Sequence, residues 1–191
     1  MNGGQCIKYF IPIGLVARKA VTESLACWKH GFAEQITDLS LVDDDAFNVV
    51  INGYDYDSEE SLKTVIDAYL KVRCGASYFD VDGTDVSSWS DKHSKFKAIE
   101  LNLNMDDVEY NTSLIRFSIE QFITKLKPKY KISGLILTLQ GGSVSLDELE
   151  AYMTIPRNAL DDGITFITNT CFFESAEEQI MTLYFAIKYD F

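Results

Sequence analysis

The sequence predicts an α+β fold, a mixed β-sheet with helices packed on it, built from two αβαββ units. Three observations lead to this prediction. Apolar residues recur at helical spacing in four stretches, other stretches alternate between apolar and polar residues, and the order of elements in the first half returns in the second. The halves, residues 1–104 with a leading strand and residues 105–191, agree in element order and poorly in residue identity. An old internal duplication would leave such a pattern.

The first half is expected to begin with an edge strand, because Pro12 cannot donate to a β-ladder. Thr22 is the expected N-cap of the first helix, and Asp57 with Glu60 is expected to form the capping box of the second. The expected elements are a strand at 7–15, a helix at 22–37, a strand at 47–53, a helix from 57 to Gly75, a strand at 76–81, a polar loop at 83–94 and a strand at 96–103.

The second half contains the most apolar strand of the chain. Residues 132–139 are almost continuously apolar, which predicts a central strand that is buried on both faces. Ser145 and Glu148 predict a capping box, and Pro156 is expected to end the helix that the box opens. The expected elements are a helix at 108–127, the strand at 132–139, a helix at 145–155 and a final hairpin of 164–173 with 181–191.

Composition and charge narrow the classes of partner. The formal net charge is −12 and the pI is about 4.5, so the surface repels nucleic-acid phosphate and anionic lipid and suits a basic protein partner. The chain shows no signal-peptide pattern and no apolar run of membrane-spanning length. The four cysteines are widely spaced without a CxxC pair, and we expect them to be reduced and mostly buried. We therefore expect a cytoplasmic protein without metal or cofactor, and the sequence leaves its oligomeric state open.

Four features of the last part of the chain resemble a known family. They are the strand that ends in Gly141-Gly142, the acidic helix start at 145–149, the turn before residues 164–166, and a terminal strand at 186–191. Over residues 108–191 the chain resembles the C-terminal domain of the bacterial tubulin homologue FtsZ. FtsZ is a GTPase through an N-terminal nucleotide domain with a glycine-rich phosphate loop, which this sequence lacks. The resemblance therefore implies a fold and an interaction surface, and it carries over no catalytic residue.

The string at residues 79–84 resembles the first motif of the haloacid-dehalogenase phosphatases. In that family a strand ends in a nucleophilic Asp, here Asp80, and a second Asp, here Asp82, acts as general acid and base with Mg²⁺ as cofactor. The residue after Thr84 is Asp85, where the family expects an apolar residue. Thr168-Asn169 resembles the second motif of the family, but the residues that follow it read as a strand and do not carry the later Lys and acidic motifs. An acidic turn explains the same string, because Asp and Gly are common turn residues.

Three hypotheses for function follow. The first is a non-enzymatic, acidic protein-binding protein, such as an immunity or inhibitor protein that neutralises a basic toxin or nuclease, because no complete catalytic set is visible. Its candidate binding residues are the acidic loop residues and one tryptophan in the polar loop, where we expect exposure: Asp55, Asp57, Asp80, Asp82, Asp85 and Trp89. The second is a Mg²⁺-dependent phosphohydrolase that uses Asp80 and Asp82. The third is an FtsZ-like interaction domain that assembles with itself.

Overall fold

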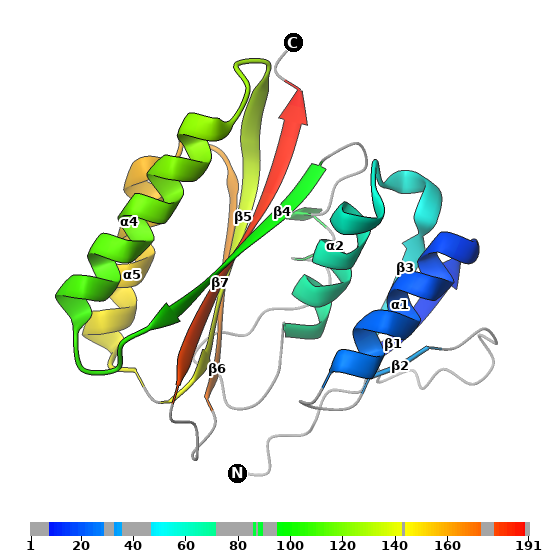
Figure 1. The fold of residues 1–191 in the computed structure, drawn as a ribbon, viewed down its shortest axis with the longest axis horizontal. Helices are drawn as coiled ribbons and strands as arrows, with labels where there is room; N and C mark the ends of the chain where they lie inside the picture. The colour runs from blue at the N-terminus through cyan, green and yellow to red at the C-terminus, as the bar shows by residue number, and fades with distance from the viewer. Residues whose placement is uncertain are drawn as a thin grey trace.

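The computed structural model describes residues 8–28, 33–35, 47–71, 86, 88–89, 95–142, 144–172 and 178–189. Figure 1 shows two β-sheets with helices packed between and beside them, which confirms the α+β class. The elements are β1 (Lys8–Ile13), α1 (Leu15–Cys27), β2 (Ala33–Gln35), β3 (Phe47–Asn52), the 3-10 turn η2 (Gly53–Asp55), α2 (Glu59–Lys71), β4 (Lys95–Leu103), α4 (Val108–Lys125), β5 (Tyr130–Gly141), α5 (Leu146–Ala159), β6 (Thr165–Phe172) and β7 (Gln179–Tyr189).

The large sheet has the strand order β4-β7-β5-β6. The helix α5 connects β5 to β6, and these strands are parallel, whereas β7 runs antiparallel to both β4 and β5. The predicted hairpin of 164–173 with 181–191 is therefore wrong, because β5 lies between those two strands. Alternation of apolar and polar residues shows which face a strand buries, but it does not identify the neighbouring strand.

The small sheet has the order β2-β1-β3, and all of its pairings are parallel. The strand β1 is therefore central, which corrects the prediction of an edge strand. The pairing with β2 covers only the first three residues of β1, Lys8 to Phe10, and Pro12 lies beyond it. At Pro12 the described pairing is with Ile51 of β3 alone, so this half of the strand still behaves as an edge.

The first helix starts earlier than the predicted range of 22–37. Gly14, with φ of 90°, turns the chain directly from β1 into α1, which ends at Cys27. Thr22 lies inside this helix, where its hydroxyl donates to the carbonyl of Arg18 at 2.8 Å, and it is not an N-cap. The predicted range overlaps α1 only at residues 22–27, and it is wrong at 33–35, which form the strand β2. The positive φ at Gly14 permits an early start that the cap residues did not indicate.

The second helix confirms its predicted apolar stripe and corrects its cap. Ser58, one residue after the predicted Asp57, accepts the hydrogen bond from the backbone N–H of Ser61 at 3.1 Å. The stripe is buried against the rest of the protein and consists of Leu62, Val65, Ile66, Tyr69 and Leu70.

Two apolar cores lie on opposite faces of the large sheet. The helices α4 and α5 cover one face, and α2 covers the other, with α1 and the small sheet beyond it (Figure 1). Leu135 and Leu137 of β5 belong to the first core, whereas Ile136 between them belongs to the second. This alternation confirms that β5 is a central strand buried on both faces.

The predicted repeat is not confirmed by the described elements. The small sheet is wholly parallel and the large sheet is mixed. The strand β4, which precedes the expected boundary at residue 104, pairs along its whole length with β7. The element order of the halves is similar, but the strands combine differently.

Two smaller expectations are also corrected. Pro156 lies inside α5, which continues for a further turn until the N–H of Leu160 donates to the carbonyl of Pro156 at 3.1 Å. Cys171 is disulfide-bonded, so the expectation of reduced cysteines is wrong at this position, and Cys27 is free and exposed.

Candidate functional site

Trp89 is a core residue. Its side chain is only 2% exposed, and its ring packs against Phe96 of β4 and Tyr184 of β7, with centroid distances of 4.9 Å and 6.4 Å. The expectation of an exposed tryptophan is therefore wrong. Its polar sequence neighbours suggested a solvated loop, but the chain returns as β4 to place Phe96 against it, and Tyr184 reaches it from a strand far along the chain.

Asp57 holds the start of α2 to β4. Its carboxylate accepts a hydrogen bond from the Ser61 hydroxyl at 2.6 Å and forms an ion pair with Lys95 at 3.0 Å, and Ser61 in turn accepts the N–H of Phe96. Burial acts to raise the pKa of Asp57, but the hydrogen bonds from Ser61 and Lys95 outweigh it and hold this pKa below its usual value. These contacts give Asp57 a structural role.

Of the other predicted acidic residues, the structure describes only Asp55. Asp55 lies in η2, where its carboxylate accepts a hydrogen bond from the side-chain amide of Asn52 at 3.2 Å. Asp80, Asp82 and Asp85 lie outside the described residues, so the phosphohydrolase motif stays a prediction. Within the described part of the chain, no cluster of three His, Cys, Asp or Glu side chains could hold a metal ion.

The two ends of the large sheet carry opposite charge. The strands β4 and β5 start, and β7 finishes, at the same end of the sheet, and α4 and α5 both finish there too (Figure 1). We call it the lysine-rich end, and its basic residues are Lys125, Lys127, Lys129, Lys131, Arg157 and Lys188, with Asp161 and Asp162 beside them. The opposite, acidic end carries no Lys or Arg in residues 104–112, 144–151 and 178–182, and its carboxylates are Asp106, Asp107, Glu109, Asp147, Glu148, Glu150 and Glu178.

Aromatic residues fix the lysine-rich end. The hydroxyls of Tyr130 and Tyr189 are 3.0 Å apart, and the ring centroids are separated by 4.6 Å. The ammonium group of Lys129 lies over both rings, 5.5 Å and 5.4 Å from their centroids. Lys125, Lys127 and Lys129 are exposed, so their charges face solvent on an otherwise acidic protein.

At the acidic end, part of the charge stabilises the helices. Asp107 caps α4 by accepting the N–H of Tyr110 at 2.8 Å. Ser145 and Glu148 form the predicted capping box of α5, which is confirmed. Negative charge at a helix N-terminus is favourable through the helix dipole. Asp106, Glu150 and Glu178 are exposed and lie outside these caps.

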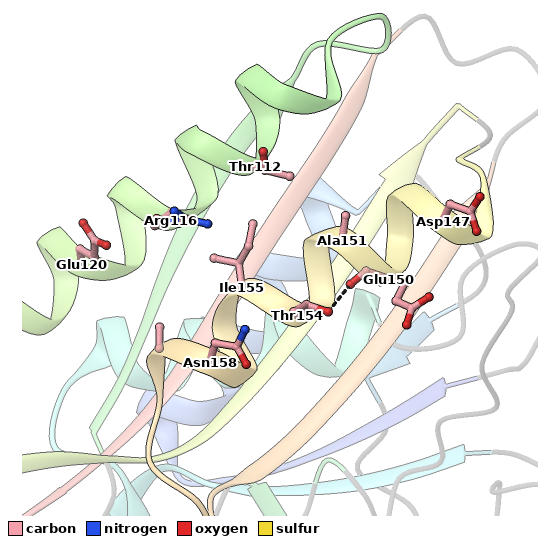
Figure 2. A pocket seen from close by; sticks show the side chains of 10 residues that line it. Thr112, Arg116, Glu120, Asp147, Glu150, Ala151, Thr154, Ile155 and Asn158 are labelled. Carbon is pink, nitrogen blue, oxygen red and sulfur yellow. Dashed lines mark hydrogen bonds between the residues drawn. The ribbon is translucent and has the colours of Figure 1, made fainter.

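An open groove lies between α4 and α5 (Figure 2). Its volume is 810 Å³, and Arg116 and Glu120 project from one wall while Asp147 and Glu150 project from the other. Asn111 of α4 donates to the hydroxyl of Tyr152 in α5 at 2.9 Å and so ties the two walls together beneath the groove.

The charge segregation and the groove were both missed from the sequence. The run at 125–131, with a lysine at every second position, was the available signal, since four of the chain's 17 basic residues fall within it. The groove had no local signal, because its walls meet only when β5 brings α4 and α5 onto one face.

No protein-family model and no curated protein matches the chain. Solved structures to which it is similar include an FtsZ mutant from M. jannaschii (13% identity over 69% of this chain and 39% of that one, TM-score 0.48). Others are TubZ from Bacillus thuringiensis serovar israelensis in GDP-form protofilaments (9%, 95% and 53%, TM-score 0.47) and CetZ2 from Haloferax volcanii (10%, 97% and 66%, TM-score 0.45).

The chain thus spans between 39% and 66% of the length of these structures. The resemblance to FtsZ seen in the sequence is confirmed as a low-identity likeness of fold, and it carries no argument about function. None of the described helices is long and apolar enough to cross a membrane.

Proposed function

We propose that this chain is a non-enzymatic protein-interaction domain that associates with itself, the acidic end of one copy contacting the lysine-rich end of the next. The observation that carries the proposal is the opposite charge of the two ends of the large sheet. A contact between unlike patches of one protein is heterologous, so each copy keeps one free end and further copies can add.

The attraction between the two ends has to exceed the repulsion between two negatively charged molecules. Two copies of net charge −12 repel one another at long range. At contact, the pairs across the interface are much closer than the remaining charges, and at about 0.1 M salt the Debye length of about 10 Å screens most of the long-range repulsion. Complementary ends therefore set which surfaces meet, as electrostatic complementarity does in other interfaces.

Two charge-reversal variants test the proposal. The first, Lys127→Glu with Lys129→Glu, lowers the net charge of the lysine-rich end from +4 to zero. The second, Asp106→Lys with Glu109→Lys, reduces the net charge of the acidic end from −7 to −3 and leaves the cap residue Asp107 in place. Sedimentation velocity or light scattering against concentration should show that the wild type associates, that neither variant does alone, and that a mixture of the two regains association.

The control reverses a charge away from both ends of the large sheet. Arg18→Glu changes an exposed residue of α1, and this variant should associate as the wild type does. A wild type that stays monomeric at every concentration would end the proposal, and so would variants that associate as well as the wild type. The immunity or inhibitor role, a cytoplasmic location and the phosphohydrolase reading of Asp80 and Asp82 stay predictions.

A further inference from the structure

Four charged side chains line the α4–α5 groove without pairing with one another. Arg116, Glu120, Asp147 and Glu150 make no ion pair with any residue in the described part of the chain, although Arg116 and Glu120 are one helical turn apart. On the other side of the molecule, lysines and carboxylates of α1, α2 and β4 are joined by ion pairs such as Lys63–Glu23 at 2.6 Å and Lys97–Glu60 at 2.6 Å. The groove therefore presents charges that an incoming chain could satisfy.

The order of these charges along the groove is specific. Figure 2 shows Asp147 and Glu150 toward the start of α5, Glu120 toward the other end of the groove, and Arg116 between them. The sequence of charge along the groove is thus acidic, basic, acidic. A segment that formed ion pairs with all of these charged groups would carry a basic, an acidic and a basic side chain in that order.

The surface between the charges allows close approach. Apart from the buried Ile155, it is formed by small or short side chains, which are Thr112, Ala151, Thr154, Asn158 and Ala159. The hydroxyl of Thr154 already donates to the carbonyl of Glu150 at 2.8 Å, so it demands no partner from a ligand. Short side chains between two helices leave room for the side chains of a third.

We infer that the α4–α5 groove binds a helix of a different protein whose facing side chains read basic, acidic, basic. On a helix, residues four and seven or eight positions apart share one face, so three such side chains span about 11 to 12 Å. The walls of the groove cover a similar length, since Glu150 to Asn158 is eight helical residues, about 12 Å.

One helix of this chain, α2, has this order of charges in Lys63, Asp67 and Lys71, but these side chains are already engaged within their own chain. Lys19 of α1 and Lys63 and Lys71 of α2 already pair with carboxylates of their own chain. The groove shares Asp147 and Glu150 with the acidic end, but Arg116 and Glu120 lie outside both ends, and none of the four is a residue changed in the self-association test.

The probes are three alanine-based helical peptides that differ only in the charged residues of one face. One carries Lys, Glu, Lys in that order, one carries three lysines, and one carries Glu, Lys, Glu. Binding is measured by calorimetry and mapped by NMR on the full chain. The Lys-Glu-Lys peptide should bind more tightly than the peptide with three lysines, although its net positive charge is lower. On binding, it should shift the NMR signals of Thr112, Ala151 and Thr154 of the protein. If binding were only a general attraction of positive charge to an acidic protein, the peptide with three lysines would have the higher affinity.

Substitutions in the protein test whether the groove residues bind the peptide. Glu120→Gln with Glu150→Gln should weaken binding of the Lys-Glu-Lys peptide by about three- to ten-fold, the range for two exposed ion pairs. The matched control, Asp161→Asn with Asp162→Asn, removes the same charge outside the groove and should leave affinity within about two-fold. Arg116→Glu should reverse the preference, so that the peptide with three lysines binds best.

Four results would overturn the inference. The first three are tighter binding of the peptide with three lysines to the wild type, equal losses of affinity in the groove and control variants, and no binding of any peptide. A fourth is a shift of groove signals when the concentration of the wild-type chain alone is raised, since that would assign the groove to a second copy. Because self-association is tested with Asp106, Glu109, Lys127 and Lys129, either idea can fail without the other.

Discussion

Gly134 of β5 lies directly against the indole of Trp89. A β-carbon at residue 134 would stand 2.8 Å from Cδ1 of Trp89 and 3.2 Å from the carbonyl oxygen of Thr165. The indole occupies the space that a side chain at this position of the large sheet would fill, and it packs there against Phe96 and Tyr184. The absence of a side chain at Gly134 is therefore what allows Trp89 to be buried.

Gly134→Ala should destabilise the protein by about 1–3 kcal/mol, the usual cost of overpacking a core. The free energy of unfolding, measured in urea, checks this. If the clash with the indole is the cause, the substitution should cost much less in a Trp89→Leu background, because a smaller side chain leaves room for the methyl group. Equal costs in both backgrounds would mean that the contact with the Thr165 carbonyl dominates.

Asp57→Asn should weaken the fold at neutral pH by about 1 kcal/mol, since a charged hydrogen bond is lost at a partly exposed site. The pKa of Asp57 is lower in the folded state than in the unfolded state, so its charged form stabilises the protein above the unfolded value of about 4. This stabilisation is lost as the pH falls through the lower, folded-state pKa.

Urea titrations at several pH values between neutral and acidic measure how much of the unfolding free energy depends on the charge of Asp57. The wild type should lose more stability than Asp57→Asn as the pH falls below about 4, so the two curves should converge. Asp162→Asn, which changes an exposed carboxylate of the turn after α5, serves as the control and should run parallel to the wild type. Curves for Asp57→Asn that stay parallel to the wild type would contradict the structural role of this carboxylate.

Tyr184→Phe should cost about 1.5–3 kcal/mol. The buried hydroxyl of Tyr184 donates to the carboxylate of Asp67 in α2 at 2.5 Å, and hydrogen bonds to charged groups are worth this much. Burial, followed by the negative charge of Asp67, raises the pKa of Tyr184 well above its usual value, so the hydroxyl stays a donor over the whole working range. Tyr110→Phe, at a half-exposed position on α4, should leave the unfolding free energy unchanged.

Ser145→Ala should lower stability by about 1 kcal/mol, because it removes the side-chain acceptor for the N–H of Glu148 and the partner of the Glu148 carboxylate. Hydrogen exchange should show faster opening of the first turn of α5, which carries Asp147 in the groove. Unchanged exchange there would show that packing against the sheet alone holds the helix start.

The sequence predicted the features that depend on residues close together in the chain. The stripe of α2, the capping box of α5 and the burial of β5 follow from spacing within one element. The position of β7 between β4 and β5 does not, because any alternating strand could fill it. The groove and the burial of Trp89 depend in the same way on residues that only the folded sheets bring together, and no local pattern records them.

The central place of β7 has a consequence for synthesis. Because β7 forms both pairings that join β4 to β5, those strands have no described contact as sheet neighbours until β7 has left the ribosome. A growing chain that has completed β4, β5 and β6 therefore exposes two unpaired edges of apolar strands, which are templates for association with the wrong chain. We expect that a binder of nascent chains would protect this protein most during the interval before its last strand emerges.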